Sequence, residues 1–211
     1  MAYDLEEQEQ LATIKSWWAQ YGRLVIVTVV AALLVVGGIR GWYYYRNSQA
    51  TSAAALFEQL QRAERASDHK KVRDIATQIV DQYAATPYAT RAALAAAKSD
   101  FDTGDLASAK TRLQWVIANA QEEEARDVAR LRLARVFFDE KNAAEALKLL
   151  ETKPTDTFAG LYADFKGDVL AAQGKRQEAR TAYQLALDKS DASSPLRQII
   201  QLKLDALGDA K

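Results

Sequence analysis

The segment GKRQEARTAYQLALDKS (residues 174–190) can be laid over three earlier segments of the chain. These are KKVRDIATQIVDQYAATP (70–87), GDLASAKTRLQWVIANA (104–120) and KNAAEALKLLE (141–151). The matching positions are separated by 33, 37 and 33 residues, and each holds an alanine: Ala76, Ala109, Ala146 and Ala179. Four residues further on stands a larger apolar residue, which is Tyr183 in the last copy. The chain therefore contains an internal repeat.

A second helix is expected upstream of three of these segments, with a small residue at a matching place: Ala97, Ala134 and Gly167. A small side chain lets a paired helix approach closely, and the larger residue one turn on fills the neighbouring groove. Five residues before the alanines stand the turn formers Gly104 and Gly174, with Lys71 and Lys141 in the other two copies. Paired helices with a period of about 34 residues are typical of tetratricopeptide repeats. An accidental match between alanine-rich helices is the alternative, and the first copy fits least well.

The apolar run LVIVTVVAALLVVGGI (24–39) predicts a transmembrane helix ahead of the repeats. Its helical length is about 24 Å against about 30 Å of hydrocarbon, so the flanks must supply the remainder. Aromatic and arginine side chains suited to the membrane interface stand at both ends: Trp17, Trp18, Tyr21, Arg23, Arg40 and Trp42. A buried core helix would leave this grouping unexplained. A cleaved signal peptide is disfavoured by the acidic residues before the run.

The predicted fold class is all-α, with one N-terminal transmembrane helix followed by a tetratricopeptide-like α-solenoid of three to four helix pairs. We expect a tail with an amphipathic segment (1–22), a transmembrane helix with aromatic flanks (23–45) and a repeat domain (46–211). Apolar residues of the tail, such as Leu5 and Ile14, mostly share one helical face. Small residues in the span would let a neighbouring membrane helix approach: Thr28, Ala32, Gly37 and Gly41.

Composition argues against nucleic-acid binding and against most catalytic chemistry. The chain has 28 basic and 28 acidic residues, a balance without the electrostatic footprint of a nucleic-acid-binding protein. It has no cysteine and one histidine, His69, so no thiol nucleophile or zinc site rich in nitrogen and sulfur ligands can be built. His69 fits a solvated loop between helices. We predict no cofactor, no metal and no enzymatic activity. The alternative from another functional class is an enzyme, namely a transferase or hydrolase whose active site is hidden among the carboxylates.

Three longer phrases carry a family resemblance: YATRAALAAAKSDFDTGDLASAKTRL (88–113), RLRLARVFFDEKNAAEALKLL (130–150) and FKGDVLAAQGKRQEARTAYQLAL (165–187). Together with the acidic tail and the flanked span, they resemble the YfgM-type ancillary subunits of the bacterial Sec translocon. The resemblance covers essentially the whole chain, and the phrase around Gly167 is its most specific part.

The resemblance implies a bacterial inner-membrane protein with a cytoplasmic N-terminus and a periplasmic repeat domain. It implies association with the SecYEG channel and with a membrane-anchored periplasmic chaperone of the PpiD type, and a role in passing unfolded, newly translocated clients to chaperones. It also implies contact of the tail with a cytosolic response regulator. Charge leaves the orientation open, because basic residues flank the span equally on both sides. A tetratricopeptide adaptor for envelope assembly or division, unconnected with translocation, is the alternative.

The first helix of each tetratricopeptide repeat is expected to line a concave binding face. Transferring the family's inward-facing positions gives Arg91, Leu94, Lys98, Phe101, Val128, Leu131, Arg135, Phe138, Leu161, Asp164 and Asp168. This mixture of apolar, aromatic and charged side chains suits extended or helical peptide segments. The alternative is that Leu94, Leu131 and Phe138 are ordinary packing residues. Phe101 and Phe138, at matching repeat positions, are the expected exposed apolar contacts.

Overall fold

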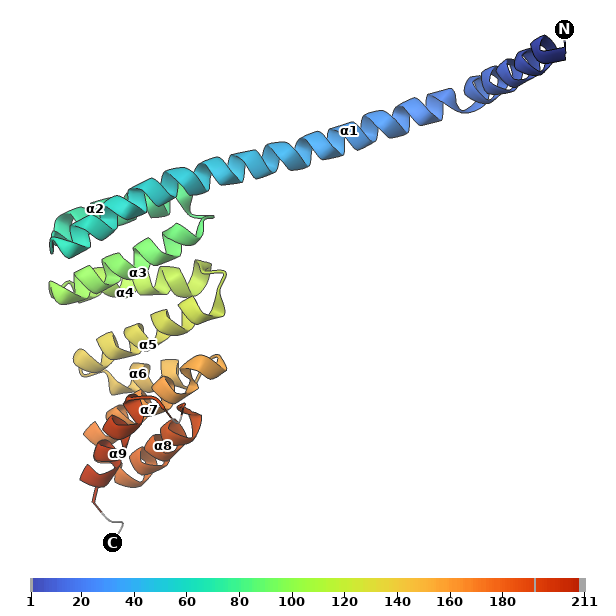
Figure 1. Cartoon of the computed structure of the whole chain (residues 1–211). Helices are drawn as coiled ribbons and strands as arrows, with labels where there is room; N and C mark the ends of the chain where they lie inside the picture. Colours follow the sequence, from blue (N-terminus) through green and yellow to red (C-terminus); the bar gives the residue numbers. More distant parts are fainter. Residues whose placement is uncertain (1, 192, 209–211) are drawn as a thin grey trace. The chain divides into compact units, whose positions relative to one another are not determined.

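The computed structural model describes residues 2–191 and 193–208, with side chains from residue 9 onward. Every regular element in this part of the chain is a helix (Figure 1), so the all-α prediction is confirmed. The chain divides into two compact units, residues 1–49 and residues 50–211. The side chain of Leu5, expected on the apolar face of the tail, lies outside the described residues.

The first unit consists of the N-terminal part of α1 (Ala2–Arg65). The apolar side chains of its central run are exposed, and Leu33 and Leu34 keep 66% and 72% of their surface accessible. This exposure argues against a buried core helix and suits the hydrocarbon interior of a bilayer. Residues Glu9–Arg65 form a helix long and apolar enough to span a membrane. Ahead of the run, Trp17 contacts Tyr21 with ring centroids 5.8 Å apart.

The second unit is a stack of helix pairs. The last part of α1 packs in one cluster with α2 (His69–Tyr83) and α3 (Pro87–Asp102), and α3 is paired with α4 (Leu106–Asn119). The next pairs are α5 (Glu123–Asp139) with α6 (Ala143–Leu150), and α7 (Asp156–Ala172) with α8 (Arg176–Lys189). A last helix, α9 (Leu196–Ala206), packs against α8. Figure 1 shows these pairs stacked in chain order, so each pair buries apolar faces that it could not bury alone.

The same tight turn joins the two helices of each pair. One residue in each turn has a positive φ angle between 53° and 80°, and these residues are Ser67, Gly104, Lys141 and Gly174. The backbone N–H of the next residue donates to a carbonyl five positions earlier, as in the 2.8 Å bond from Asp105 to Asp100. Equivalent bonds of 2.8 to 3.0 Å start from Asp68, Asn142 and Lys175. This recurring bond gives an alignment of the repeats that does not depend on side chains.

The turns correct the sequence alignment of the first repeat. Its turn residue is Ser67, whereas Lys71 lies inside α2. Counting five residues on from Ser67 places Val72, and not Ala76, at the position of Ala109. Val72 is 2% exposed and Ala76 is fully buried one helical turn further on. The first repeat therefore follows the others, with a register one turn earlier than the alanines suggest.

Small residues lie where helices of a pair meet. Ala109, Ala146 and Ala179 are each fully buried on the second helices α4, α6 and α8. On α7, a Cβ atom added to Gly167 would lie 2.4 Å from the ring of Tyr183, far inside van der Waals contact. The Tyr183 ring therefore occupies the space that a side chain at this position would take.

Candidate functional site

The first helices α3, α5 and α7 carry the residues predicted to bind partners, and we call their shared surface the first-helix face. Counted back from the turn residues, the predicted positions fall at the same four places on α3 and α5, and α7 carries three of these four. Arg91, Lys98 and Arg135 are exposed. The partly buried members are Leu94, Phe101, Val128, Leu131 and Phe138.

A cavity of about 230 Å³ opens between α3 and α5 on this face. Three predicted residues line it, namely Lys98, Phe101 and Arg135. Five further lining residues were not predicted to bind partners: Ala97, Asp102, Leu113, Arg132 and Val136. Leu113 and Val136 are each 2% exposed, so they form the apolar floor of the cavity. The remaining predicted positions of the first-helix face do not line this cavity.

Charged side chains stand on both helices around the cavity. On α3, the Lys98 ammonium donates to the Asp102 carboxylate over 2.6 Å. On α5, the Arg132 guanidinium donates to the backbone carbonyl of Leu94 over 3.2 Å. Desolvation by the neighbouring protein lowers the pKa of Arg132 from its ordinary value, although the group stays charged at neutral pH. The Arg135 guanidinium lies 5.1 Å from the centroid of the Phe165 ring.

The two phenylalanines at matching repeat positions have different surroundings. Phe101 lines the open cavity. Phe138 meets the buried Phe165 ring edge to face, with centroids 5.8 Å apart, and packs with the cluster between α5 and α7. Phe138 therefore acts in packing, which was the alternative considered for it. Phe101 also packs against a buried cluster, but it lines an open cavity as well.

The α7 end of the first-helix face differs from the prediction. Leu161 is 36% exposed, but Asp164 is only 8% exposed. Lys203 of α9 donates to Asp164 at 2.8 Å and to Asp168 at 2.8 Å. Asp168 also accepts a hydrogen bond of 2.8 Å from the Tyr183 hydroxyl. Asp164 and Asp168 therefore both bind Lys203 of α9, so neither is a free carboxylate on an open surface.

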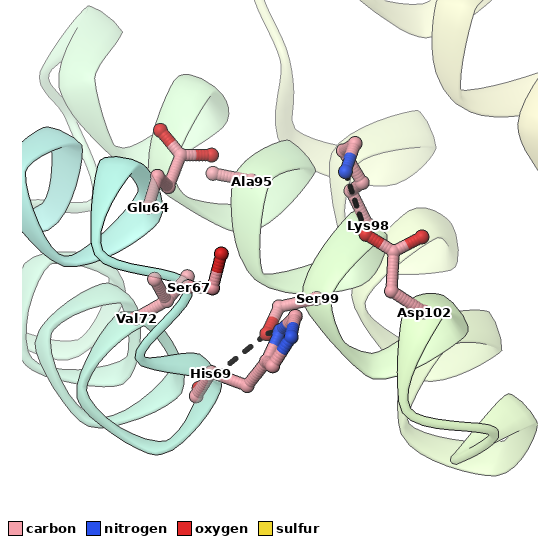
Figure 2. Close-up of a pocket in the computed structure, with 8 residues that line it drawn as sticks. All are labelled: Glu64, Ser67, His69, Val72, Ala95, Lys98, Ser99 and Asp102. Atoms are coloured by element: carbon pink, nitrogen blue, oxygen red, sulfur yellow. Dashed lines mark hydrogen bonds and ion pairs between the residues drawn. The ribbon is translucent and has the colours of Figure 1, made fainter.

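A second cavity, of about 160 Å³, lies where the end of α1 faces α3 (Figure 2). His69 is partly buried there and its Nδ1 lies 2.9 Å from the Ser99 hydroxyl, whereas the sequence suggested a solvated loop. Lys98 and Asp102 line this cavity as well as the first one. Sequence spacing gives no signal for the contact between His69 and Ser99, because it joins residues 30 positions apart. Within the described residues, no group of three or more histidine, aspartate or glutamate side chains could hold a metal ion.

Comparison with known proteins gives both a family and a fold. A family model described as a tetratricopeptide repeat-like domain matches residues 15–209. A protein of Neisseria gonorrhoeae named "Ancillary SecYEG translocon subunit" is 32% identical over 208 residues, which cover 98% of this chain and 100% of the relative. A protein of the same name from Escherichia coli K12 is 32% identical over 204 residues, covering 95% of this chain and 96% of the relative.

A solved structure supports the architecture. It contains tetratricopeptide-like repeats of a Podosopora anserina protein described as a kinesin light chain. Its TM-score is 0.56 at 18% sequence identity, and the match covers 75% of this chain and 86% of that one. At this identity the likeness concerns the fold alone.

Proposed function

Because the chain belongs to the family of ancillary SecYEG translocon subunits, we propose that it holds a polypeptide-binding groove beside the exit of the Sec channel. In this proposal, the repeat domain binds segments of newly translocated polypeptides. It then passes them to a membrane-anchored periplasmic chaperone of the prolyl-isomerase type. The family is one of non-enzymatic scaffolds, which agrees with the prediction that the chain is not an enzyme.

One observation carries the binding part of this proposal: the open cavity beside Phe101. An exposed cavity with an apolar floor and polar walls suits a side chain of an extended peptide, since unfolded polypeptides present apolar groups next to polar backbone. The floor residues Leu113 and Val136 come from two different repeats, so the cavity depends on their stacking. A groove built in this way accommodates an apolar side chain together with the polar backbone beside it.

The domain organisation is part of the proposal. Residues 1–22 form a cytoplasmic tail, residues 23–45 cross the inner membrane, and residues 46–211 lie in the periplasm. The exposed apolar side chains of α1 support the span. The tail contacts a cytosolic response regulator, and small residues of the span, including Gly37 and Gly41, pack against a channel helix. The inferred contact of the tail rests on family resemblance, and deletion of residues 2–16 is expected to abolish it without loss of membrane insertion.

Site-specific photo-crosslinking in native membranes tests where the groove works. A photoreactive residue at Phe101 is expected to capture translocating clients or a periplasmic chaperone, and one at Gly37 is expected to capture a channel subunit. Gln114, which is exposed on α4 away from the cavity, provides the matched control position. Equal capture of clients from Phe101 and Gln114 would contradict the assignment of the groove. Failure to copurify channel subunits would favour an adaptor for envelope assembly or division.

Protease accessibility tests the orientation. In spheroplasts, added protease is expected to degrade the repeat domain because that domain faces the periplasm. Full protection of the domain in intact spheroplasts, with degradation after lysis, would place it in the cytoplasm. That result would overturn both the orientation and the transfer of clients to periplasmic chaperones.

A further inference from the structure

The cavity beside Phe101 has an unbalanced charge. Lys98 on α3 is neutralised by Asp102. Arg132 and Arg135 on α5 also border the cavity, and the ion pairs found among the described residues include neither of them. The side chains that line this cavity therefore carry a net positive charge, which comes from the two arginines on α5.

Both arginines keep hydrogen-bonding capacity for a ligand. A guanidinium carries five N–H donors, and Arg132 uses one of its nitrogens in the bond to the Leu94 carbonyl. Arg135 contacts the Phe165 ring, a contact that leaves donors in the plane of the guanidinium free. On the α7 side, Asp164 shares Lys203 with Asp168 and also feels the charge of Arg135, so Arg132 is the arginine farther from compensation. A carboxylate is the group that two such arginines bind best, because charge and planar geometry both match.

The cavity itself has room for one large apolar side chain. A volume of about 150 Å³ is enough to hold a benzene-sized group in an apolar protein cavity. The present cavity measures about 230 Å³ and is floored by Phe101, Leu113 and Val136. An apolar side chain in it would lie on the same side of the groove as the arginines, since Arg132 and Val136 are one helical turn apart on α5.

We propose that this groove selects polypeptide segments in which an acidic residue lies beside a large apolar residue. The apolar side chain enters the cavity, and the carboxylate binds Arg132 and Arg135. This inference rests on the proposed function, because it names the class of client segment that the same groove takes.

Peptide binding to the full-length protein in detergent micelles provides the test. Three fluorescent peptides of equal length carry glutamate, glutamine or lysine beside the same leucine, and their affinities are measured by fluorescence anisotropy. We expect the glutamate peptide to bind about tenfold more tightly than the glutamine peptide, because charge-assisted hydrogen bonds are the stronger ones. The lysine peptide is expected to bind most weakly, and added salt is expected to reduce the advantage of glutamate.

Variants separate charge selection from groove binding. The double substitution R132Q with R135Q is expected to remove the preference, so that the glutamate and glutamine peptides bind with equal affinity. Unchanged helical circular dichroism reports that this variant is folded. The double variant R132K with R135K is expected to restore part of the preference. R176Q, which removes an exposed arginine of α8 outside the first-helix face, is the matched control and is expected to keep the full preference.

Each outcome has one meaning. If glutamate and glutamine peptides bind equally, or if R132Q with R135Q keeps the preference, the charge selection is wrong. Groove binding still stands in that case, provided that F101S weakens all three peptides. If F101S leaves all three affinities unchanged, or if no peptide binds, both the charge selection and the proposed function of the groove fail.

Discussion

At Gly167, a single hydrogen atom in place of a side chain allows α7 and α8 to pack. A Cβ atom there would lie 2.4 Å from the Tyr183 ring, which is 3% exposed and hydrogen-bonded to Asp168. The ring cannot move away without breaking that bond or displacing its neighbours. We expect Gly167→Ala to lower the free energy of unfolding by about 1–3 kcal/mol, the usual cost of overpacking a core. Urea unfolding of the full-length protein, followed by circular dichroism, measures it.

Gly160→Ala is the graded control for this prediction. A Cβ atom at Gly160 would lie 2.7 Å from the Ser190 hydroxyl, a small group that can rotate away at the loss of its hydrogen bond to the Ala186 carbonyl. Its substitution is expected to cost less than that of Gly167. Equal losses of stability in the two variants would show that the Tyr183 ring is not the obstacle.

The raised pKa of Tyr183 determines how the stability of the folded state changes at alkaline pH. Burial, followed by the hydrogen bond to Asp168, raises the pKa of the Tyr183 hydroxyl above its ordinary value of 10.0. Hydrogen bonds to Asp164 and Asp168 outweigh desolvation and raise the pKa of Lys203 above 10.5. The folded state therefore binds more protons than the unfolded state once the pH exceeds about 10, so stability falls as the pH rises further.

Thermal unfolding midpoints measured between neutral pH and the alkaline range test this sign. The wild-type midpoint is expected to stay level until the pH approaches 10 and then to fall. Tyr183→Phe removes one of the titrating groups, so its midpoint is expected to start lower, through the lost hydrogen bond, and to fall less steeply with pH. A steeper alkaline fall in this variant would contradict the role given to Tyr183.

At the scale of the elements, Lys141 tests whether the turn between paired helices strains a residue that is not glycine. This residue adopts a φ of 64°, whereas glycine stands at the equivalent turn positions 104 and 174. A lysine in the left-handed region is strained by about 1 kcal/mol, and glycine is not. We expect Lys141→Gly to raise the free energy of unfolding by up to about 1 kcal/mol, measured by urea unfolding. Gly174→Ala is the reverse control and is expected to lower it, and a gain in stability there would refute the strain argument.

The turns also show how much of the repeat could be predicted from the sequence. Gly104 and Gly174 mark their turns because glycine favours positive φ angles, and the alanine spacing placed Lys141 in the same class. Ser67 gives no such signal, so the alignment of the first repeat relied on Ala76 and came out one helical turn late. A backbone conformation that an ordinary residue adopts under tertiary constraint leaves no mark in the composition.

Contacts between distant elements were predicted least well. The bond between Lys203 and Asp164 joins residues 39 positions apart, and it changes Asp164 from an expected binding residue into a buried anchor for α9. Arg132 was missed for a related reason, since its place at the cavity depends on how α5 packs against α3. Periodicity identifies which face of a helix is buried, but it does not identify the partner that covers a polar residue on the other face.

At the scale of the whole molecule, the chain combines two different parts. The repeat unit buries its apolar side chains in its own cores, whereas the apolar run of α1 is not packed against any of these cores. The described repeat unit contains four clusters of buried side chains. The apolar run of α1 contributes to none of them. The exposed apolar surface of this run is therefore suited to the interior of a bilayer.

Charges placed in the middle of the run test that requirement. An arginine at the centre of a spanning helix costs about 2.5–3.5 kcal/mol on insertion scales, so the double variant V30R with L34R is expected to fail in stable insertion. Wild-type protein is expected to remain in the membrane pellet after an alkaline carbonate wash, and the double variant to appear in the supernatant. The matched control is Y43R with Y44R at the flank, where arginine side chains can reach the headgroups and the protein is expected to stay in the pellet. If the central variant also stays in the pellet, the membrane attachment does not depend on this run, and the single-span organisation would have to be abandoned in favour of attachment through a partner.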